Sequence, residues 1–426
     1  MSLKGFLKFA VVGFLGLVLS IGLIVVRETV SERSEYREKV YSEMAKTTAA
    51  SQILLGPILV FPYERVSKSN SEVQQRFHFV YPKQLAIVGN LKSERRYRGL
   101  YEVLLYDADL TVDGTFNYRK PEIDEDVRWL KPYIVVLVQD SRGISTLPVL
   151  TWNDGGIEVK PGPGDLKIGL NGGFHADLPV EIQKGGAYNF HVAFRLRGMQ
   201  SFGWLPVGEN TKVSLKSDWP HPSFQGRSLP VSHAIAENGF EAVWESNHFG
   251  SNETPLLETA ASPINFQDQD TNVRFFQPVD IYVQTERAVK YGFLFVALTF
   301  AAFLAFEAIQ KLSIHPVQYG FVGTAIVVFY ILLLALSEHI SFVWAYVSAS
   351  LASASLLAFY ARYVLQSWAR SLIFAAALIV LDSIVYGILQ SEDFALLYGS
   401  LLLFSVLAVA MIITRRVNWN ELKSEL

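Results

Sequence analysis

The chain has no cysteine, and this absence removes several kinds of chemistry together. Disulfide bonds, zinc–thiolate sites, iron–sulfur clusters and thiol nucleophiles are all excluded. A strong excess of charge is also missing, because 37 lysines and arginines stand against 40 acidic residues. The formal net charge of −3 provides no basic field for nucleic acid, so we expect no nucleic-acid partner.

Recognisable catalytic and cofactor motifs are absent as well. The sequence has no Gly-x-Ser-x-Gly elbow, no P-loop and no strand-to-helix GxGxxG fingerprint. The glycine-rich segment 152–173 contains prolines that oppose a phosphate-binding helix start. It predicts a long surface connection that could separate two β lobes. The histidines show no i, i+4 or His-x-His spacing. We therefore expect no catalytic residues, no metal site and no cofactor.

Long apolar runs, by contrast, are frequent, and a membrane-spanning helix needs about 20 such residues. The first run, 9–26, passes directly into Arg27 and Glu28 without a small-x-small cleavage site, which indicates an uncleaved signal anchor. Further runs crowd the last third of the chain, at 291–309, 316–336, 340–361, 371–390 and 394–414.

The orientation of these six predicted helices follows from lysine and arginine in the short loops. The two short outer loops, 337–341 and 391–393, carry acidic residues and no lysine or arginine. The inner segments hold Lys4, Lys8, Lys311, Arg362, Arg370, Arg415, Arg416 and Lys423. We expect both termini in the cytoplasm, the lipid bilayer as a partner, and a large domain in the periplasm of a bacterial inner-membrane protein.

The large domain begins with a charged, proline-free helical pattern and then changes to a β pattern. Residues 27–55 are expected to form a juxtamembrane helical stalk. After it, segments rich in β-branched and aromatic residues alternate; Phe190, Val192 and Phe194 fall on one face, with His191 and Arg195 on the other. Turn signals are Asp113-Gly114 and Asn238-Gly239.

The fold class predicted from these patterns is a multi-pass α-helical membrane protein. A large, mostly β extracytoplasmic domain, sandwich-like and antiparallel, is expected between the first and second transmembrane helices. The predicted parts are the N-terminus with the signal anchor at 1–26, the stalk at 27–55, the β-rich domain at 56–290, five transmembrane helices at 291–414 and a cytoplasmic tail at 415–426.

The most unusual stretch of the β-rich region is SDWPHPSF, residues 217–224. Pro220 and Pro222 favour an extended backbone at the residues that precede them, so the stretch predicts a stiff loop and not a helix. Two interpretations stay open. Trp219 either packs into one end of the sandwich, or Asp218, Trp219 and His221 form a binding patch for a ligand or partner.

Polar residues also occur within or next to the predicted membrane helices. Asp382 lies about 10 Å inside the end of its helix at 1.5 Å per residue. A charge at such a depth is costly and usually faces a bundle interior, where it serves structure or transport. Glu307 has Lys311 at i+4 as an expected partner. Glu338 and His339, in a short outer loop, are expected to contact the large domain.

Several of these segments together resemble the CreD family of bacterial inner-membrane proteins. They are SDWPHPSF, RETVSERSEYREKV followed by LLGPILVFPY, QPVDIYVQTERAVKYGFLFVALTF, LSEHI and ITRRVNW, and the resemblance extends over nearly the whole chain. It implies a role in cell-envelope integrity and stress responses, and it implies no catalytic residues.

The resulting hypothesis is a non-enzymatic protein of envelope integrity whose β domain binds an envelope protein or a cell-wall component. One alternative is a transporter or lipid-handling protein that uses Asp382. A second alternative is a hydrolase at the periplasmic face, because paired carboxylates meet in space and not in sequence. Its ordinary candidates are Glu94, Glu102, Asp107 and Asp109.

Overall fold

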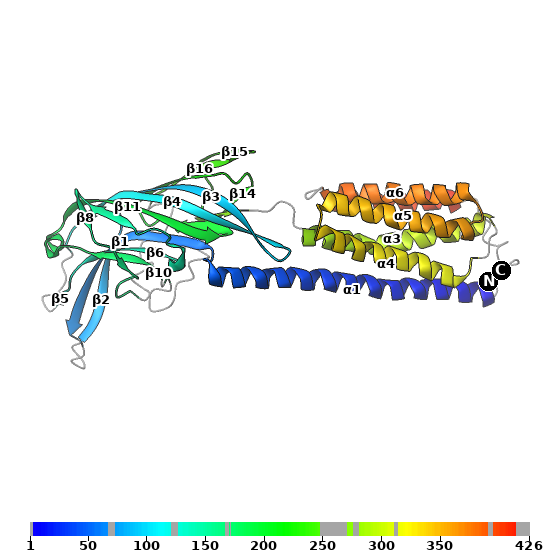
Figure 1. Ribbon diagram of the computed structural model, residues 1–426, viewed down its shortest axis with the longest axis horizontal. Coiled ribbons are helices and arrows are strands. Elements are labelled where there is room, and N and C mark those ends of the chain that lie inside the picture. Colours follow the sequence, from blue (N-terminus) through cyan, green and yellow to red (C-terminus); the bar gives the residue numbers. More distant parts are fainter. Residues whose placement is uncertain are drawn as a thin grey trace. The chain divides into compact units, whose positions relative to one another are not determined.

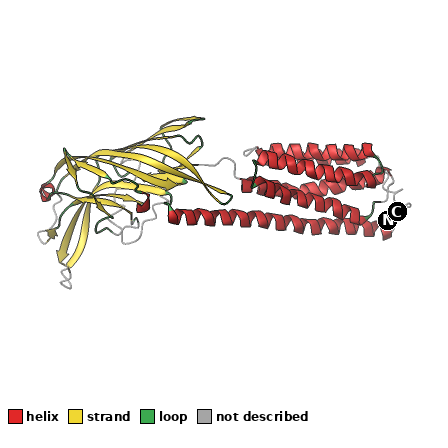
Figure 2. Ribbon diagram, viewed as in Figure 1, coloured by secondary structure: helices red, strands yellow, loops and turns green. Residues whose placement is uncertain are grey.

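A computed structural model describes residues 3–66, 73–120, 127–166, 170, 172–247, 271–275, 281–310, 314–390 and 395–414. The chain divides into two compact units. The membrane unit consists of Met1–Glu38 and Val279–Leu426, and the β unit consists of Lys39–Pro278. Figures 1 and 2 show that helices make up nearly all of the first unit and strands nearly all of the second.

The helices are α1 (Leu3–Thr47), α3 (Ile281–Gln310), α4 (Pro316–Ser337), α5 (Phe342–Val364), α6 (Trp368–Gln390) and α7 (Ala395–Thr414). Among the described residues, α1, α4, α5 and α6 are long and apolar enough to cross a membrane. Helices α3 and α7 occupy the other two predicted segments. The predicted fold class is confirmed: a β domain is inserted between a first membrane helix and a C-terminal group of helices.

Element boundaries differ from the predicted ones at both ends of the β-rich region. Helix α1 continues without interruption through the charged segment to Thr47, and the first strand already begins at Gln52. Helix α3 begins at Ile281, before the apolar run at 291. Hydrogen bonding along a helix is not limited to its apolar part, so an apolar run marks the membrane portion and not the helix ends.

Small residues allow close packing inside the membrane unit. A Cβ atom added at Gly323 of α4 would lie 2.0 Å from the Leu19 side chain of α1, and one at Gly292 of α3 would lie 2.9 Å from Leu23. Helix α4 also packs on α3 and α5, and α6 packs on α5 and α3. Helix association within a membrane depends on such close contacts, because lipid is as apolar as the side chains.

The β unit contains two sheets, drawn as facing layers in Figure 1. The nine-stranded sheet contains β1 (Gln52–Val66), β2 (Val73–Val80), β5 (Val127–Trp129), β6 (Tyr133–Val138), β9 (Lys160–Pro161), β10 (Gly172–Asp177), β12 (Ser201–Leu205), β14 (Pro222–Gly226) and β17 (Thr271–Phe275). The eight-stranded sheet contains β3 (Gln84–Arg98), β4 (Tyr101–Tyr118), β7 (Val149–Trp152), β8 (Gly155–Ile157), β11 (Gly186–Met199), β13 (Asn210–Ser217), β15 (Ser232–Ala236) and β16 (Gly239–Asn247).

One apolar core joins the two sheets, so they form a single sandwich. Leu59 and Phe61 of β1 share this core with Ile87 of β3 and with Phe190 and Val192 of β11. The alternation predicted for β11 is confirmed by its burial pattern. The predicted connection at 152–173 is partly regular structure, because it contains β8, β9 and the start of β10.

Two strand pairs depart from the expected antiparallel arrangement. β1 pairs with β12 in parallel, and β3 pairs with β13 in parallel. The members of each pair are far apart in the sequence, and the side-chain pattern of a strand does not specify the direction of its partner. The sheets are therefore mixed.

The predicted turn at Asp113-Gly114 is wrong, whereas the one at Asn238-Gly239 is confirmed by the β15–β16 hairpin. Asp113 and Gly114 lie inside β4, paired with both β3 and β11. A Cβ atom at Gly114 would lie 2.2 Å from the backbone oxygen of Gln84 and 2.6 Å from the ring of Phe190. Glycine is required there because strands and a ring approach closely, which is the other common reason for glycine in a strand.

Substitution of this glycine tests the packing. Gly114→Ala should destabilise the β unit by about 1–3 kcal/mol, the usual range for overpacking. Gly156→Ala is the matched control, because nothing lies within 4 Å of its added Cβ. Thermal unfolding of the purified full-length protein in detergent, followed by near-ultraviolet circular dichroism, measures both. Equal melting temperatures for the two variants would contradict the close approach.

Candidate functional site

The loop 217–224 connects the two sheets. β13 belongs to the eight-stranded sheet and β14 to the nine-stranded sheet, so residues 218–221 carry the chain from one layer to the other. Pro220 lies in this crossing segment and Pro222 is the first residue of β14, two positions at which the missing backbone N–H of proline is tolerated. The segment is extended and not helical, as the sequence predicted.

The Trp219 side chain belongs to the shared core of the sandwich and is 4% exposed. Its indole N–H donates to the backbone oxygen of His221 at 3.1 Å. The guanidinium of Arg95 lies over its ring at 5.2 Å from the centroid, which adds a cation–π contact. These contacts agree with the interpretation in which Trp219 packs into the sandwich.

Asp218 and His221 differ from Trp219 in exposure, because both are exposed. The Asp218 carboxylate accepts a hydrogen bond from the backbone N–H of Ser93 at 2.8 Å, which fixes the loop to β3. The His221 ring meets the Trp219 ring edge to face, with centroids 6.1 Å apart. Of the three residues predicted as a binding patch, Asp218 and His221 are exposed and Trp219 is buried.

Two substitutions distinguish the roles of these side chains. Trp219→Ala should lower the stability of the β unit by about 3–5 kcal/mol, the usual cost of removing a buried tryptophan. His221→Ala should leave the melting temperature nearly unchanged. Thermal melts of the two full-length variants in detergent measure this difference. A Trp219→Ala variant that melts like the unsubstituted protein would contradict the structural interpretation.

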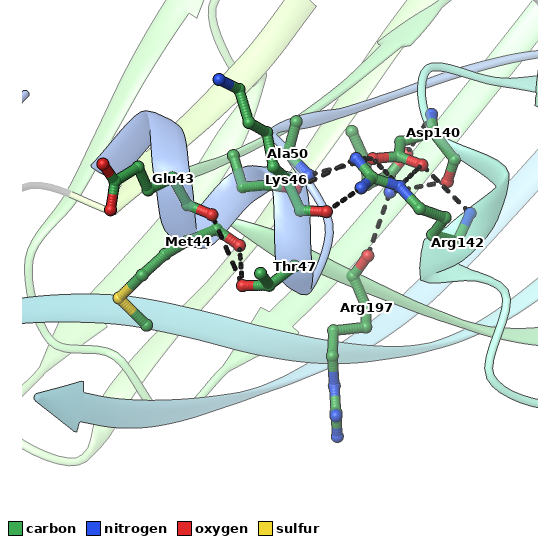
Figure 3. A network of polar contacts seen from close by, with 10 residues as sticks. Glu43, Met44, Lys46, Thr47, Ala50, Asp140, Arg142 and Arg197 are labelled. Carbon is green, nitrogen blue, oxygen red and sulfur yellow. Dashed lines mark hydrogen bonds and ion pairs between the residues drawn. The ribbon is translucent and has the colours of Figure 1, made fainter. Parts of the chain in front are cut away.

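The carboxyl end of α1 forms a polar network within the β unit (Figure 3). The Arg142 guanidinium, in the 3₁₀ turn η1 (Ser141–Gly143) after β6, donates to the backbone oxygens of Lys46 and of Ala45, the latter at 3.0 Å. It also pairs with both carboxylate oxygens of Asp140, at 2.6 and 2.9 Å. A helix leaves its last four carbonyls without partners and carries negative partial charge there, so a cation stabilises this end.

Asp140 is held in its ionised form by this network. Hydrogen bonds from Arg142 keep its pKa below the usual value. A lowered pKa stabilises the fold above the ordinary pKa of aspartate, about 4, and this contribution is lost as the pH falls below it.

The same helix end contacts the β3–β4 hairpin. The Tyr41 hydroxyl donates to the backbone oxygen of Glu102 at 3.0 Å. Glu43 pairs with Arg98 at 2.9 Å. The last turns of α1 are therefore a built-in part of the β unit.

Glu338 belongs to a second polar cluster, within the membrane unit. Its side chain is 9% exposed, accepts a hydrogen bond from the Tyr282 hydroxyl at 3.1 Å and lies 3.8 Å from Arg33 of α1. Arg37 stacks on the Tyr282 ring at 5.4 Å. The predicted neighbour His339 is exposed. Glu338 therefore fastens the loop after α4 to α1 and α3.

Glu307 and Asp382 are the buried acids of the membrane helices. Glu307 accepts a hydrogen bond from the Tyr319 hydroxyl of α4 at 2.9 Å. Its predicted partner Lys311 lies outside the described residues. Tyr319 was missed as a partner because it lies on the next helix, and a contact between two helices gives no i, i+4 signal.

Asp382 is 8% exposed and lines a pocket among α3, α4, α5 and α6. The other lining residues are Phe295, Ile326, Phe329, Ser353, Ala354, Leu357 and Leu378. The free space of about 20 Å³ suits roughly one water molecule. Most of the lining is apolar, so Asp382 and Ser353 supply its polar surface.

The carboxylates considered for hydrolysis have partners on the sheet surface. Asp107 pairs with Arg197 at 2.7 Å and Asp109 with Arg195 at 2.6 Å, each directly across the β4–β11 register. Glu94 and Glu102 pair with Arg96 and Arg95 at 2.9 and 3.5 Å. Among the described residues, no three His, Asp or Glu side chains come together as a metal site.

Comparison with known proteins identifies the family of the chain. The family profile described as "Inner membrane protein CreD" matches residues 4–420. The chain belongs to the CreD family. The curated Inner membrane protein CreD of Escherichia coli K12 is 36% identical over 414 residues, which cover 95% of this chain and 91% of that protein. The resemblance seen in the sequence is confirmed, and the protein is an inner membrane protein.

Solved structures give much weaker likenesses. An M1 zinc metallopeptidase from Deinococcus radiodurans aligns with 46% of this chain and 42% of its own length, at 11% identity and a TM-score of 0.23. A substrate-bound mutant from the same organism aligns over the same shares at 9% identity and the same TM-score. The chain thus covers less than half of the length of these enzymes.

Proposed function

We propose that this inner-membrane protein supports the integrity of the cell envelope, and that its β unit lies in the periplasm and binds a partner protein there. In this proposal six helices, α1 and α3 to α7, cross the membrane with both termini in the cytoplasm. The proposal rests on membership of the CreD family and on one feature of the β unit, the edge strand β15.

Strand β15 is suited to pairing with an extended segment of another protein. It ends the order of the eight-stranded sheet, and all five of its residues are exposed. Leu229 and Val231 before it and Ile235 within it are at least half exposed and apolar. Soluble proteins usually protect such an edge with charge or proline, because it presents free backbone donors and acceptors. An uncharged apolar edge is typical of partner binding by strand addition.

Helix α1 supplies a way for binding to reach the membrane. Arg27 and Arg33 pair with Glu286 and Glu338 in the membrane unit, at 3.3 and 3.8 Å. Further along the same helix, Glu43 and the last carbonyls are held within the β unit.

The transport alternative ranks second. The pocket at Asp382 holds space for about one water molecule and is mostly apolar, which suits a buried polar group better than a substrate path. The hydrolase alternative loses support because its candidate carboxylates are engaged in ion pairs.

Charge introduced at the edge strand tests the binding function. In an Escherichia coli strain that lacks its own CreD-family protein, the unsubstituted chain should reduce sensitivity to detergent and leakage of a periplasmic enzyme. Ile235→Lys should lose most of this protection, because a lysine on an edge strand opposes strand addition. Val149→Lys is the matched control, since Val149 is 59% exposed on β7, an inner strand of the same sheet.

Both variants should accumulate to equal levels with unchanged melting temperatures, since the changed side chains are exposed. No protection by the unsubstituted chain would contradict the envelope role. Full protection by Ile235→Lys would contradict the assignment to β15 and leave the envelope role standing.

Single cysteines test the proposed orientation, because the chain has none of its own. Ser341→Cys, between α4 and α5, and Glu237→Cys, in the β15–β16 turn, should react with a membrane-impermeant maleimide in spheroplasts. Ser367→Cys, between α5 and α6, should react only after the membrane is opened. The reverse pattern at either membrane loop would exclude the six-helix topology with cytoplasmic termini.

A further inference from the structure

The Asp382 carboxyl group has no ion-pair partner among the described residues, although it is buried among helices. The cations of α5 and α6 are engaged elsewhere: Arg362 stacks on Trp368, and Arg370 donates to the backbone oxygen of Leu365. Arg370 is also twelve residues away on the same helix, about 18 Å at 1.5 Å per residue. Helices α4 and α7 contain no charged residue at all.

Polar groups near Asp382 are neutral hydroxyls on neighbouring helices. Ser350 of α5 faces its carboxyl group, at an approach that falls short of a well-formed hydrogen bond. Tyr330 of α4 is 1% exposed, and its hydroxyl has no hydrogen-bond partner among the described residues. The Tyr346 hydroxyl donates to the backbone oxygen of Asp382 at 3.0 Å and therefore does not neutralise the carboxylate.

The remaining neighbours of Asp382 add no charge. Tyr346 and Tyr386 pack against each other with ring centroids 5.2 Å apart. Helix α3 contributes the apolar Phe295 to the pocket, and α6 itself contributes Leu378. An ionised carboxylate at a helix centre in the membrane is costly, and no counter-charge among the described residues offsets it.

We propose that Asp382 is a proton-binding site of the membrane unit: it holds a proton at neutral pH and releases it when the pH rises. A proton fits the geometry better than a metal cation such as Na⁺, which requires several oxygen ligands converging on one point. In the protonated form the carboxyl group donates to Ser350 or to a water molecule in the adjoining pocket, and Ser353 offers that water a second partner.

Infrared difference spectroscopy of the full-length protein in lipid vesicles tests this site. The spectrum of the unsubstituted protein minus that of Asp382→Asn should contain the carbonyl band of a protonated carboxylic acid at neutral pH. The band should disappear at alkaline pH and return when the pH is lowered again. If Asp382→Asn does not fold, Asp382→Glu replaces it, and the band should shift instead of disappearing.

Three results would overturn the proposal. Absence of the band throughout the pH range in which the protein stays folded means that Asp382 is ionised. A band that persists until the protein unfolds means that the Asp382 carboxyl group stays protonated as a permanent hydrogen-bond donor and does not release its proton. Loss of the band at constant pH on addition of NaCl, but not of choline chloride, assigns the site to Na⁺. None of these results bears on the envelope role, which complementation tests separately.

Discussion

The junction between α1 and β1 is held by hydrogen bonds from the helix end, the turn after β6 and the facing sheet. A helix ends at Thr47 and a central strand begins at Gln52, so carbonyl groups that have lost helical partners lie next to a buried sheet. Arg142 satisfies the helix end, and Asp140 orients Arg142. These contacts lie at the exposed side of the junction, so they orient the helix end and favour its negative partial charge, and they do not rescue buried carbonyl groups.

Gln52 extends the same network to both sheets. Its side chain is fully buried, donates to the backbone oxygens of Asp140 and Arg197, and accepts from the backbone N–H of Asp140. Asp140 follows β6 of one sheet, whereas Arg197 lies on β11 of the other. One amide therefore joins the two layers, and Asp140 links it to the Arg142 guanidinium at the helix end.

Sequence patterns predicted those features that depend on local periodicity or on length. The apolar runs located the membrane helices, and alternation assigned Phe190 and Val192 to the core. Predictions from these patterns failed where the role of a residue comes from a contact with another strand or helix. Gly114 looked like a turn residue because its contact with Gln84 and Phe190 arises only when three strands assemble. Tyr319, which comes from the next helix, gave no such local signal as a partner of Glu307; the predicted partner Lys311 lies outside the described residues.

At the candidate sites, too, local features were predicted from the sequence and contacts between elements were not. Burial of an acid at 382 follows from its place in an apolar run, but the hydroxyl groups of Tyr330 and Ser350 come from other helices and have no local signal. Arg142 was not among the predicted residues at all. Its surroundings in the sequence are those of an ordinary polar turn, and its importance comes from the helix end that the fold brings to it.

The order in which strands enter the two sheets has a consequence for biogenesis. β1 is the first strand to be synthesised, yet its neighbours β6 and β12 lie at 133–138 and 201–205. β3 likewise cannot pair with its parallel partner β13 until residues 210–217 have been synthesised. Contacts of such high sequence separation fold slowly, because the entropy of closing a long loop is lost before any contact compensates for it. The edge of β1 at Gln52–Leu55 that pairs with β12 therefore stays unpaired until β12 has been made, and an unpaired strand edge favours aggregation during that interval.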